Sequence, residues 1–367
     1  MEKTKQREIK LDIIRIFALL CVIGVHFFLN SGFYNVTIEG KKMLIMCIIR
    51  SFFIICVPMF ITLTGYLMNK KKLSKQYYKG IVKTLIIYLI CSIIYSLFLK
   101  FYLNYDMNIK LFIENVLSYN GTKYAWYIEM YIGLFLLIPF LNLIFNNLNS
   151  KKEAKILLFT LLVLVGLPSI LNVFRFDLLE WWKNPASSFE YMKLVPSWWT
   201  SIYPIFYYFL GAYLSKYEVN ISKKLNVLLL IVVVILDGLF NFYRSSGIKY
   251  LWAPWNDYNS LTIMVITFLV FNLLLKIKIK KDNKIINNIL ITMSNACLGA
   301  FLISCIFDNI YYTRLKESVP MFANRFVYAP LMIILVFVSS IIVSILINLI
   351  YETIIKLLEK PKIKWRM

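Results

Sequence analysis

Charged side chains are scarce in this chain. Asp, Glu, Lys and Arg make up only 16% of its 367 residues, whereas soluble domains contain about a quarter. The polar surface is therefore too small to cover a water-soluble core. Hydrophobic residues reach 60%, and the mean hydropathy is +0.70. This composition excludes a disordered chain, a collagen and a disulfide scaffold, and it predicts an all-α polytopic membrane protein.

Histidine is almost absent, and cysteine is absent from the expected loops. His26 is the only histidine, so a multi-histidine metal site is excluded and we expect no metal. The cysteines lie within apolar runs and show neither zinc-ligand spacing nor extracellular pairing, so we interpret them as small buried hydrophobic residues. They are Cys21, Cys47, Cys56, Cys91, Cys297 and Cys305.

The chain instead contains a series of apolar runs, each of about 20 residues, the length at which a helix crosses a bilayer. We predict about ten transmembrane helices in a domain over residues 12–351. A cytoplasmic segment, 1–11, precedes this domain, and a basic cytoplasmic tail, 352–367, follows it. The runs lie near 12–30, 43–68, 80–103, 125–147, 155–173, 198–215, 224–243, 257–275, 285–311 and 328–351.

Positive charge is unevenly distributed among the loops. The chain has 41 Lys and Arg against 19 Asp and Glu, a net charge of +22. If ten helices alternate in direction, 26 of the 41 basic residues fall on the side that holds both termini. The positive-inside rule makes that side cytoplasmic. Because the surplus positive charge is divided among short loops, we expect no nucleic-acid partner. The apolar runs and the high Lys, Ile and Asn content indicate a bacterial plasma-membrane protein in contact with lipid.

The first expected helix carries two of the few ionisable residues within a span. Arg15 and His26 are eleven positions apart, which places them on one face of a helix and about 16 Å apart along its axis. Arg15 has two interpretations, a side chain that reaches lipid phosphates or a functional cation. His26 is either a buried imidazole with one hydrogen bond or a general base, because an unperturbed imidazole titrates near neutrality.

Three further charges lie well inside expected spans, away from the span ends. Arg50, Glu129 and Asp237 fall in the outer half of the membrane, at about the depth of His26 when helix rise is counted from each span's middle. We therefore predict a polar layer near the midplane. An alternative is a structural ion pair between Arg50 and either Glu129 or Asp237.

Two surface features differ between the faces. Seven of the eight tryptophans, Trp126 among them, lie on or near the outer side, where they could stack on sugar rings, anchor the interface or pack in loops. The cytoplasmic loop NKKKLSKQYYKGIVK contains six lysines. They serve as a topology signal with attraction to anionic lipid, or as a docking surface for cofactor phosphates. Four of them, Lys71, Lys72, Lys75 and Lys79, are candidate cofactor ligands.

Five segments, in order, resemble the acyltransferase family 3 membrane proteins. Arg15 and His26 match the signature of the first helix. Thr64-Gly65-Tyr66-Leu67 resembles a Ser-Gly-Phe/Tyr-Leu motif that precedes a basic loop. The segment YAWYIEMYIGLFLLIPFL, from Tyr124, is similar to a helix that opens on Leu-Trp-Phe/Tyr. The segment PIFYYFLGAYLS, from Pro204, is similar to a Tyr-Phe-x-x-Gly helix. The segment SNACLGAFLISCIF, from Ser294, is similar to a late helix that reads Gly-Ile-Tyr-Leu-Ile-His.

The chain departs from this pattern at two positions. Many family members have a histidine where this chain has Tyr124, and many have another where it has Ser304. A mechanism that needs those histidines does not transfer to this chain, so the role of base falls to His26. The resemblance is to the stand-alone type, without an extracytoplasmic esterase-like domain.

The resemblance implies transfer of an acyl group, usually acetyl, from cytoplasmic acyl-CoA, with acetyl-CoA as the usual co-substrate. The implied acceptor is a hydroxyl of an extracytoplasmic polysaccharide or lipid-linked sugar. On this reading His26 is the base, Arg50 stabilises the oxyanion and Glu129 orients or balances the cations. Arg15 joins the four loop lysines in binding the cofactor. The acceptor-binding candidates are Trp126, Tyr207, Tyr208 and Asp237.

Two other functions are compatible with the same residues. A transporter or flippase of a lipid-linked sugar would share the outer tryptophans and the polar layer. A non-catalytic membrane assembly subunit would need neither a base nor a donor site. Movement of substrate without consumption of acyl-CoA would favour the transporter, and a phenotype retained without His26 would favour the subunit.

Overall fold

The computed structural model describes residues 7–184, 186, 191–278 and 283–359. Across this part of the chain the regular structure is helical, and β-pairing is limited to two isolated bridges, Thr37 with Lys249 and Ile38 with Ser246. The all-α membrane fold is therefore confirmed. Most of the basic tail expected at 352–367 lies outside the described residues.

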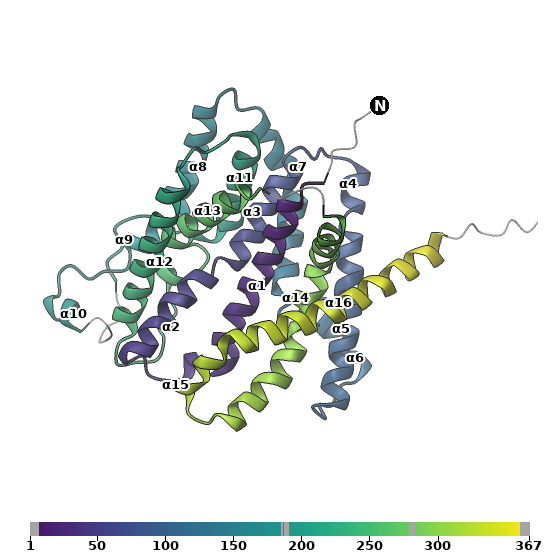
Figure 1. Cartoon of the computed structure of the whole chain (residues 1–367). Helices are drawn as coiled ribbons and strands as arrows, with labels where there is room; N and C mark the ends of the chain where they lie inside the picture. The colour runs from purple at the N-terminus through teal and green to yellow at the C-terminus, as the bar shows by residue number, and fades with distance from the viewer. Residues whose placement is uncertain (1–6, 185, 187–190, 279–282, 360–367) are drawn as a thin grey trace, which may run out of the picture.

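Eight helical segments of the described residues are long and apolar enough to cross a membrane. They coincide with eight of the ten expected runs (Figure 1). They contain α1 (Ile9–Ser31), α2 (Gly40–Phe53) with α3 (Cys56–Met68), α4 (Lys75–Lys79) with α5 (Val82–Phe101), α7 (Trp126–Asn146), α12 (Lys223–Ser245), α13 (Leu261–Leu275), α14 (Lys284–Ser318) and α16 (Ala329–Glu359).

The two remaining runs form shorter helices. The run near 155–173 holds α8 (Lys151–Val165) and the four-residue α9 (Pro168–Leu171), and the run near 198–215 holds α11 (Tyr203–Lys216). At 1.5 Å per residue, helices of 15 and 14 residues extend only about 22 Å, less than the hydrocarbon core of about 30 Å. Pro168 and Pro204 lie at the starts of α9 and α11, where their missing amide hydrogens cost nothing.

The second expected span is broken in the middle. α2 ends at Phe53 and α3 begins at Cys56. Pro58 follows directly, and a proline inside a helix lacks an amide hydrogen and clashes with the carbonyl four residues earlier, here that of Ile54. The helical path resumes with Met59, whose amide donates to the carbonyl of Ile55 at 2.9 Å.

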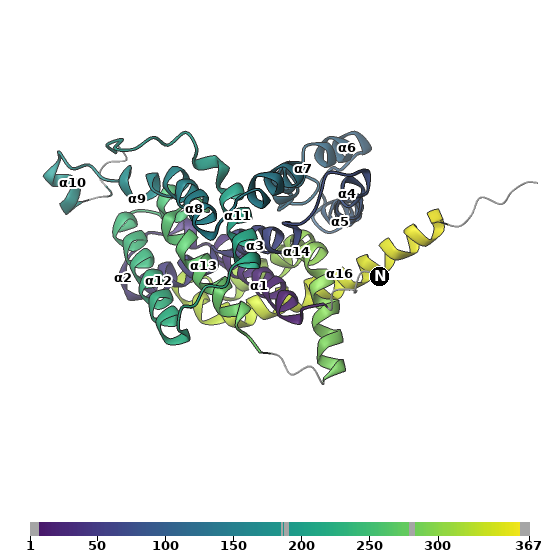
Figure 2. The ribbon, with the colours of Figure 1, turned by 90° about the horizontal axis from the view of Figure 1, so that it is seen from above.

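The centre of the molecule is formed by α1, α3, α11 and α14 (Figure 2). α3 and α11 cross at two glycines. A Cβ on Gly65 would lie 1.9 Å from the Tyr208 carbonyl oxygen, and a Cβ on Gly211 would lie 1.9 Å from that of Thr62. The two backbones therefore touch, as small residues allow in membrane helices.

The ends of the helices separate into two groups, as the predicted topology requires. The start of α1 lies beside the end of α3 and the first half of α14, at the top of Figure 1 with α4. The end of α1 lies beside the end of α14 and α15 (Phe322–Arg325), at the opposite end of the molecule. With the positive-inside assignment, the first end is cytoplasmic and the second is outer.

The other elements are short. Two helices, α6 (Ile109–Leu117) and α10 (Leu179–Lys183), lie between longer ones. The 3₁₀ turns are η1 (Phe33–Asn35), η3 (Thr200–Ile202), η4 (Pro254–Asn256) and η5 (Phe326–Tyr328).

Candidate active site

Three cavities follow one another along α1. The cytoplasmic cavity, about 460 Å³, includes Asp12 and Arg15. The membrane cavity, about 180 Å³, includes Arg15 and Val22. The outer cavity, about 460 Å³, includes Asn30. Because α1 rises 1.5 Å per residue, these residues order the cavities from the cytoplasmic to the outer side of the protein.

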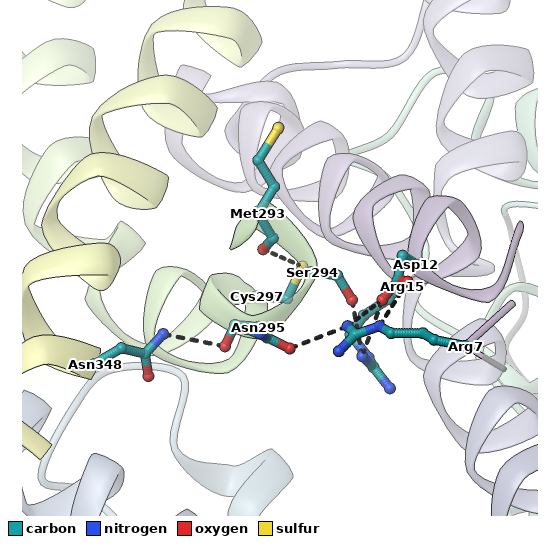
Figure 3. Close-up of polar contacts among 8 residues, drawn as sticks. All are labelled: Arg7, Asp12, Arg15, Met293, Ser294, Asn295, Cys297 and Asn348. Atoms are coloured by element: carbon teal, nitrogen blue, oxygen red, sulfur yellow. Dashed lines mark hydrogen bonds and ion pairs between the residues drawn. The ribbon is translucent and has the colours of Figure 1, made fainter. Parts of the chain in front are cut away.

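The cytoplasmic cavity is built on a buried carboxylate. Asp12 is 3% exposed, and both of its oxygens accept from Arg7, from Nε at 2.9 Å and from Nη2 at 2.5 Å. The hydrogen bond to Asp12 raises the pKa of Arg7. Figure 3 shows Arg7 and Arg15 converging on Asp12, with Ser294 and Asn295 of α14 beside them.

Arg15 lies where the cytoplasmic and membrane cavities meet, since it lines both. Its Nη1 donates to the Ser294 hydroxyl at 2.8 Å and lies 3.9 Å from an Asp12 oxygen. About 30% of its side chain remains exposed. A cation held in this way can still contact a ligand that passes from one cavity to the other.

The membrane cavity is mostly apolar and lies between α1, α3, α5, α7 and α14. Its walls include Val57, Phe60, Tyr127, Cys297 and Phe301. Pockets for drug-sized ligands are about 300–1,000 Å³, so a cavity of about 180 Å³ suits a narrow chain rather than a sugar. Burial of the Cys297 thiol agrees with the interpretation of the cysteines as buried residues, and all six are free and buried.

His26 lies on α1 between a residue that lines the membrane cavity and one that lines the outer cavity. Val22 and Asn30, one turn before and one turn after it on α1, line the two cavities. Its ring stacks on Tyr124, with centroids 3.8 Å apart and planes at 27°. Tyr124 in turn packs on Phe301 at 6.3 Å, and Phe301 belongs to the membrane cavity.

Asp308 of α14 lies beside the imidazole. Its Oδ2 lies 3.4 Å from His26 Nδ1 and accepts a hydrogen bond from the Tyr124 hydroxyl at 2.6 Å. The Asp308 side chain is fully buried. Burial and the Asp308 charge raise the pKa of Tyr124 well above the ordinary value, so the phenol keeps its proton and acts as a donor.

This arrangement assigns the two imidazole nitrogens. A carboxylate beside Nδ1 favours the tautomer with hydrogen on Nδ1, which leaves the lone pair on Nε2. Nδ1 is fully buried, whereas the side chain as a whole is 9% exposed. The distance of 3.4 Å exceeds that of a well-formed hydrogen bond, and Nδ1 has no other hydrogen-bond partner in the described part of the chain.

Asn30 connects this cluster to the outer cavity. Its amide nitrogen donates to the His26 carbonyl at 2.9 Å and to the Tyr124 hydroxyl oxygen at 3.1 Å. Its amide oxygen accepts from Lys123 Nζ at 3.0 Å. The outer cavity therefore adjoins the His26 cluster on its outer side.

The sequence reasoning missed Asp308, Asp12 and Asn30. Asp308 lies within the expected span 285–311, one turn after Ser304 and near the outer end of that span. Counting it as an intramembrane carboxylate would have identified it. Ser304 itself is buried, and its hydroxyl donates to the Phe301 carbonyl at 2.8 Å.

Arg50 lies in a different cluster from His26. Its Nε donates to the Tyr34 hydroxyl at 2.9 Å, and its guanidinium faces the rings of Tyr250 and Trp252 at 4.6 and 4.8 Å. Tyr34 packs on Phe33, which packs on Phe28 of α1. Phe28 is two residues, and hence about 200°, around the helix from His26. Arg50 and His26 therefore do not share one polar pocket, as the predicted polar layer would suggest, but lie on different faces of α1.

Asp237 belongs to the Arg50 cluster. Asn241 Nδ2 donates to Asp237 Oδ2 at 2.9 Å, Asn256 Nδ2 donates to Asn241 Oδ1 at 2.8 Å, and Arg50 Nη1 donates to the Asn256 carbonyl at 3.2 Å. Within the described residues no direct ion pair joins Arg50 and Asp237. The two charges are instead linked through Asn241 and Asn256. This resembles the structural ion pair that was the alternative to a functional polar layer, but the contact is indirect.

The other candidates are spread over α7 and α11. The Glu129 side chain is exposed rather than part of the buried layer. Trp126 is 40% exposed and stacks on Tyr258. Tyr207 and Tyr208 are fully buried and donate to the Tyr258 carbonyl at 2.7 Å and to Asn142 Oδ1 at 2.6 Å. Both tyrosines are thus engaged in helix packing.

The outer tryptophans have different environments. Trp181 and Trp255 are buried against the guanidinium of Arg244, at 4.3 and 4.8 Å, and Arg244 is itself fully buried. Trp198 is 88% exposed. Loop packing therefore accounts for Trp181 and Trp255, and the others remain open to a ligand or to the interface.

The loop lysines are exposed, on a rigid base. The four candidates, Lys71, Lys72, Lys75 and Lys79, all point to solvent. Beneath them, Asn142 of α7 donates to the carbonyls of Met68 and Lys71 at 2.8 and 2.7 Å. These bonds satisfy carbonyls at the end of α3 and fix the start of the loop.

Comparisons with known proteins agree with this architecture. The family model described as an acyltransferase domain matches residues 8–349. Proteins named probable poly-beta-1,6-N-acetyl-D-glucosamine export protein, from Staphylococcus aureus strains MRSA252, MSSA476 and NCTC 8325 / PS 47, are each 26% identical over 275 residues. The match covers 71% of this chain and 74% of each relative. No solved structure shows a significant match.

Proposed function

We propose that this chain, which belongs to the acyltransferase family 3 over residues 8–349, transfers an acetyl group from cytoplasmic acetyl-CoA to a hydroxyl of an extracytoplasmic glycan or lipid-linked sugar. One observation carries the proposal. His26, the only histidine, lies on α1 between a residue that lines a cavity reaching Arg15 and one that lines a cavity on the outer side. A base in this position can serve a donor and an acceptor that arrive from opposite faces.

The donor enters from the cytoplasmic side. Lys71, Lys72, Lys75 and Lys79 together with Arg15 supply positive charge for the phosphates of the coenzyme. The thioester arm extends past Arg15 into the membrane cavity, whose small volume and apolar lining suit a narrow chain. The reactive carbonyl then lies near Phe301, on the inner side of His26 and Tyr124.

The acceptor hydroxyl approaches from the outer cavity. Nε2 of His26 removes its proton as the oxygen attacks the thioester carbonyl, so that the C–O bond forms. The C–S bond then breaks, and the proton passes from Nε2 to the leaving thiolate. Asp308 acts as a positioning residue because it holds Nδ1 and stabilises the imidazolium.

Neither Arg50 nor Glu129 supports this chemistry in the way expected from the sequence. Arg50 lies on the opposite side of α1, and Glu129 is exposed. Trp126, with its partly exposed ring, remains the best candidate to contact the acceptor. Tyr207 and Tyr208 are engaged in helix packing, and Asp237 belongs to the separate Arg50 cluster.

The names of the relatives raise export of a glycan as a second function. A polysaccharide that crosses this protein would need a continuous path through the membrane. The cavity at the level of Val22 is about 180 Å³ and is separated from the outer cavity by the His26 cluster, which favours transfer of a small group over passage of a sugar chain. Export would leave acetyl-CoA unconsumed.

The decisive experiment supplies labelled acetyl-CoA to membranes that contain wild-type protein or the His26→Ala and His26→Gln variants. We expect wild type to label a glycan fraction, and both variants to insert normally and to lose transfer by at least about 10²-fold. Normal labelling by either variant would exclude His26 as the base. A glycan that moves while acetyl-CoA is untouched would identify a transporter, and a cellular phenotype retained by both variants would identify an assembly subunit.

A further inference from the structure

The lining of the outer cavity carries positive charge only, and the buried Asp308 carboxylate lies behind it, linked to Lys123 through Tyr124 and Asn30. Lys123, Lys316 and Arg325 line it, and no carboxylate is among its lining residues in the described part of the chain. Nor does any described carboxylate lie within 4 Å of these three side chains. The nearest acid in sequence, Glu317, follows Lys316 on α14 and so points about 100° away around the helix.

Lys123 is held over the reaction centre. Its Nζ donates to Asn30 Oδ1 at 3.0 Å and lies 5.6 Å from the centroid of the Tyr124 ring. Asn30 and Tyr124 are both in direct contact with His26. A group bound by Lys123 is therefore within a few side chains of the base.

Arg325 shapes the cavity. Its Nη1 donates to the Ser31 carbonyl at 2.8 Å, its Nε to Val319 at 2.7 Å and its Nη2 to Pro320 at 2.7 Å. It thereby joins the carboxyl ends of α1 and α14, whose partial negative charges suit a cation. These are neutral carbonyls, so Arg325 still contributes to the positive potential of the cavity.

The cytoplasmic cavity, unlike the outer one, is lined by equal numbers of positive and negative side chains. There, Arg7 and Arg15 lie beside Glu8 and Asp12, so that two positive charges meet two negative ones. The positively lined cavity lies on the outer side, where the positive-inside rule predicts fewer basic residues. A concave site lined by one sign of charge raises the local concentration of opposite charge.

We propose that the outer cavity binds an oxyanion, a phosphate or a carboxylate, carried by the acceptor, with Lys123 and Lys316 as its ligands. Binding there would place a neighbouring hydroxyl of the same molecule beside His26. That the bound molecule is the acceptor rests on the proposed function. The binding of an oxyanion does not, so the two can fail separately.

The test measures binding without acyl transfer. Outside-out membrane vesicles that contain the whole protein are treated with a membrane-impermeant, amine-reactive reagent. Labelling of Lys123 and Lys316 is followed by mass spectrometry in the presence of glucose 1-phosphate, glucuronate or glucose. The three probes share one ring and differ in charge. Lys110, an exposed lysine that does not line the cavity and that the predicted topology places outside, is the internal control.

We expect glucose 1-phosphate or glucuronate to slow labelling of Lys123 and Lys316 about tenfold at saturation, as for a charge-assisted contact. Glucose should have no effect, and Lys110 should react equally in all samples. The anion that protects identifies the group. Equal labelling in all three samples would overturn the proposal, as would equal protection of Lys110.

Two variants and one lipid comparison complete the test. Lys316→Gln should weaken the protection of Lys123 about tenfold, whereas Lys316→Arg should retain it and Lys110→Gln should leave it unchanged. Equal loss in Lys316→Gln and Lys110→Gln would mean a general surface effect and exclude a site. Protection by anionic phosphatidylglycerol alone, absent in phosphatidylcholine vesicles, would show a lipid headgroup site and overturn an acceptor site.

Discussion

A carboxylate beside one nitrogen of a buried histidine favours the tautomer that leaves the lone pair on the other nitrogen. In this protein Asp308 lies beside His26 Nδ1 and also accepts from Tyr124, which stacks on the ring. Tyr124 stands where many members of the family have histidine. The hydroxyl of Tyr124 keeps a hydrogen bond to Asp308 that a second histidine could also make, so the departure preserves the polar link without a second titrating ring.

Replacement of Asp308 should expose its positioning role. Asp308→Asn is nearly isosteric but removes the charge that holds Nδ1–H, so we expect kcat to fall by about 10²–10³-fold with little change in KM for the donor. The measurement is steady-state transfer from acetyl-CoA, with membrane insertion checked in parallel. Tyr124→Phe, which removes the hydroxyl that donates to Asp308 and accepts from Asn30 but leaves the Asp308 charge in place, is the matched control and should cost less. Equal losses in both variants would point to structural damage.

Arg15 should act on the donor rather than on the chemical step. Its side chain lines both the cytoplasmic and the membrane cavity. Arg15→Ala should therefore raise KM for acetyl-CoA about tenfold or more, the effect of losing one charge-assisted contact. Arg15→Lys should retain part of the affinity. A titration of labelled acetyl-CoA on purified protein provides the check, and an unchanged KM in Arg15→Ala would exclude the docking role.

At the scale of elements, the contact between α3 and α11 determines the position of the basic loop. The two backbones touch at Gly65 and Gly211, and Asn69, just after α3, donates to the Ser215 hydroxyl of α11 at 2.7 Å. Separation of these helices would displace the loop lysines relative to Arg15.

Small additions at this crossing should therefore destabilise the protein. In Gly65→Ala the new methyl group would meet a backbone oxygen that no side-chain rotation can move, and we expect a loss of about 1–3 kcal/mol. The apparent Tm in detergent provides the measurement. The control is Gly133→Ala on α7, where nothing lies within 4 Å of the added Cβ and a slightly higher Tm is expected. Equal Tm values for both variants would contradict the close contact.

At the scale of the whole molecule, the described residues place cavities on the cytoplasmic and the outer side of His26. The cytoplasmic and membrane cavities meet at Arg15, the outer cavity begins at Asn30, and His26 lies between Val22 and Asn30. In the proposed function, the donor and the acceptor would therefore reach His26 from opposite faces of the membrane.

The orientation of the molecule can be tested with single cysteines. All six native cysteines are buried, so background labelling by an impermeant maleimide should be low. We expect Asn120→Cys, at an exposed outer position, to react in intact cells. Gln76→Cys, exposed on α4, should react only after the membrane is opened. The reverse pattern would invert the topology and place the loop lysines outside.

Some properties of this protein follow from the sequence alone, because they depend on position along the chain. Apolar length predicted the helical membrane fold and located its spans, although α8 and α11 proved shorter than a bilayer. Helical periodicity placed Arg15 and His26 on one face, and both contact α14, through Ser294 and Asp308. Counting residues along an axis is enough for such conclusions.

Only the tertiary structure decided which helices lie beside one another. Arg50 and Asp237 were assigned the depth of His26 from the sequence, but they lie in a separate cluster, whereas Asp308 reaches His26 from a helix almost three hundred residues further along the chain. Depth in a membrane follows from apolar length, but lateral contact depends on how side chains of different helices fit together. The cavities exist only in that packing, so the route from donor to acceptor was decided there.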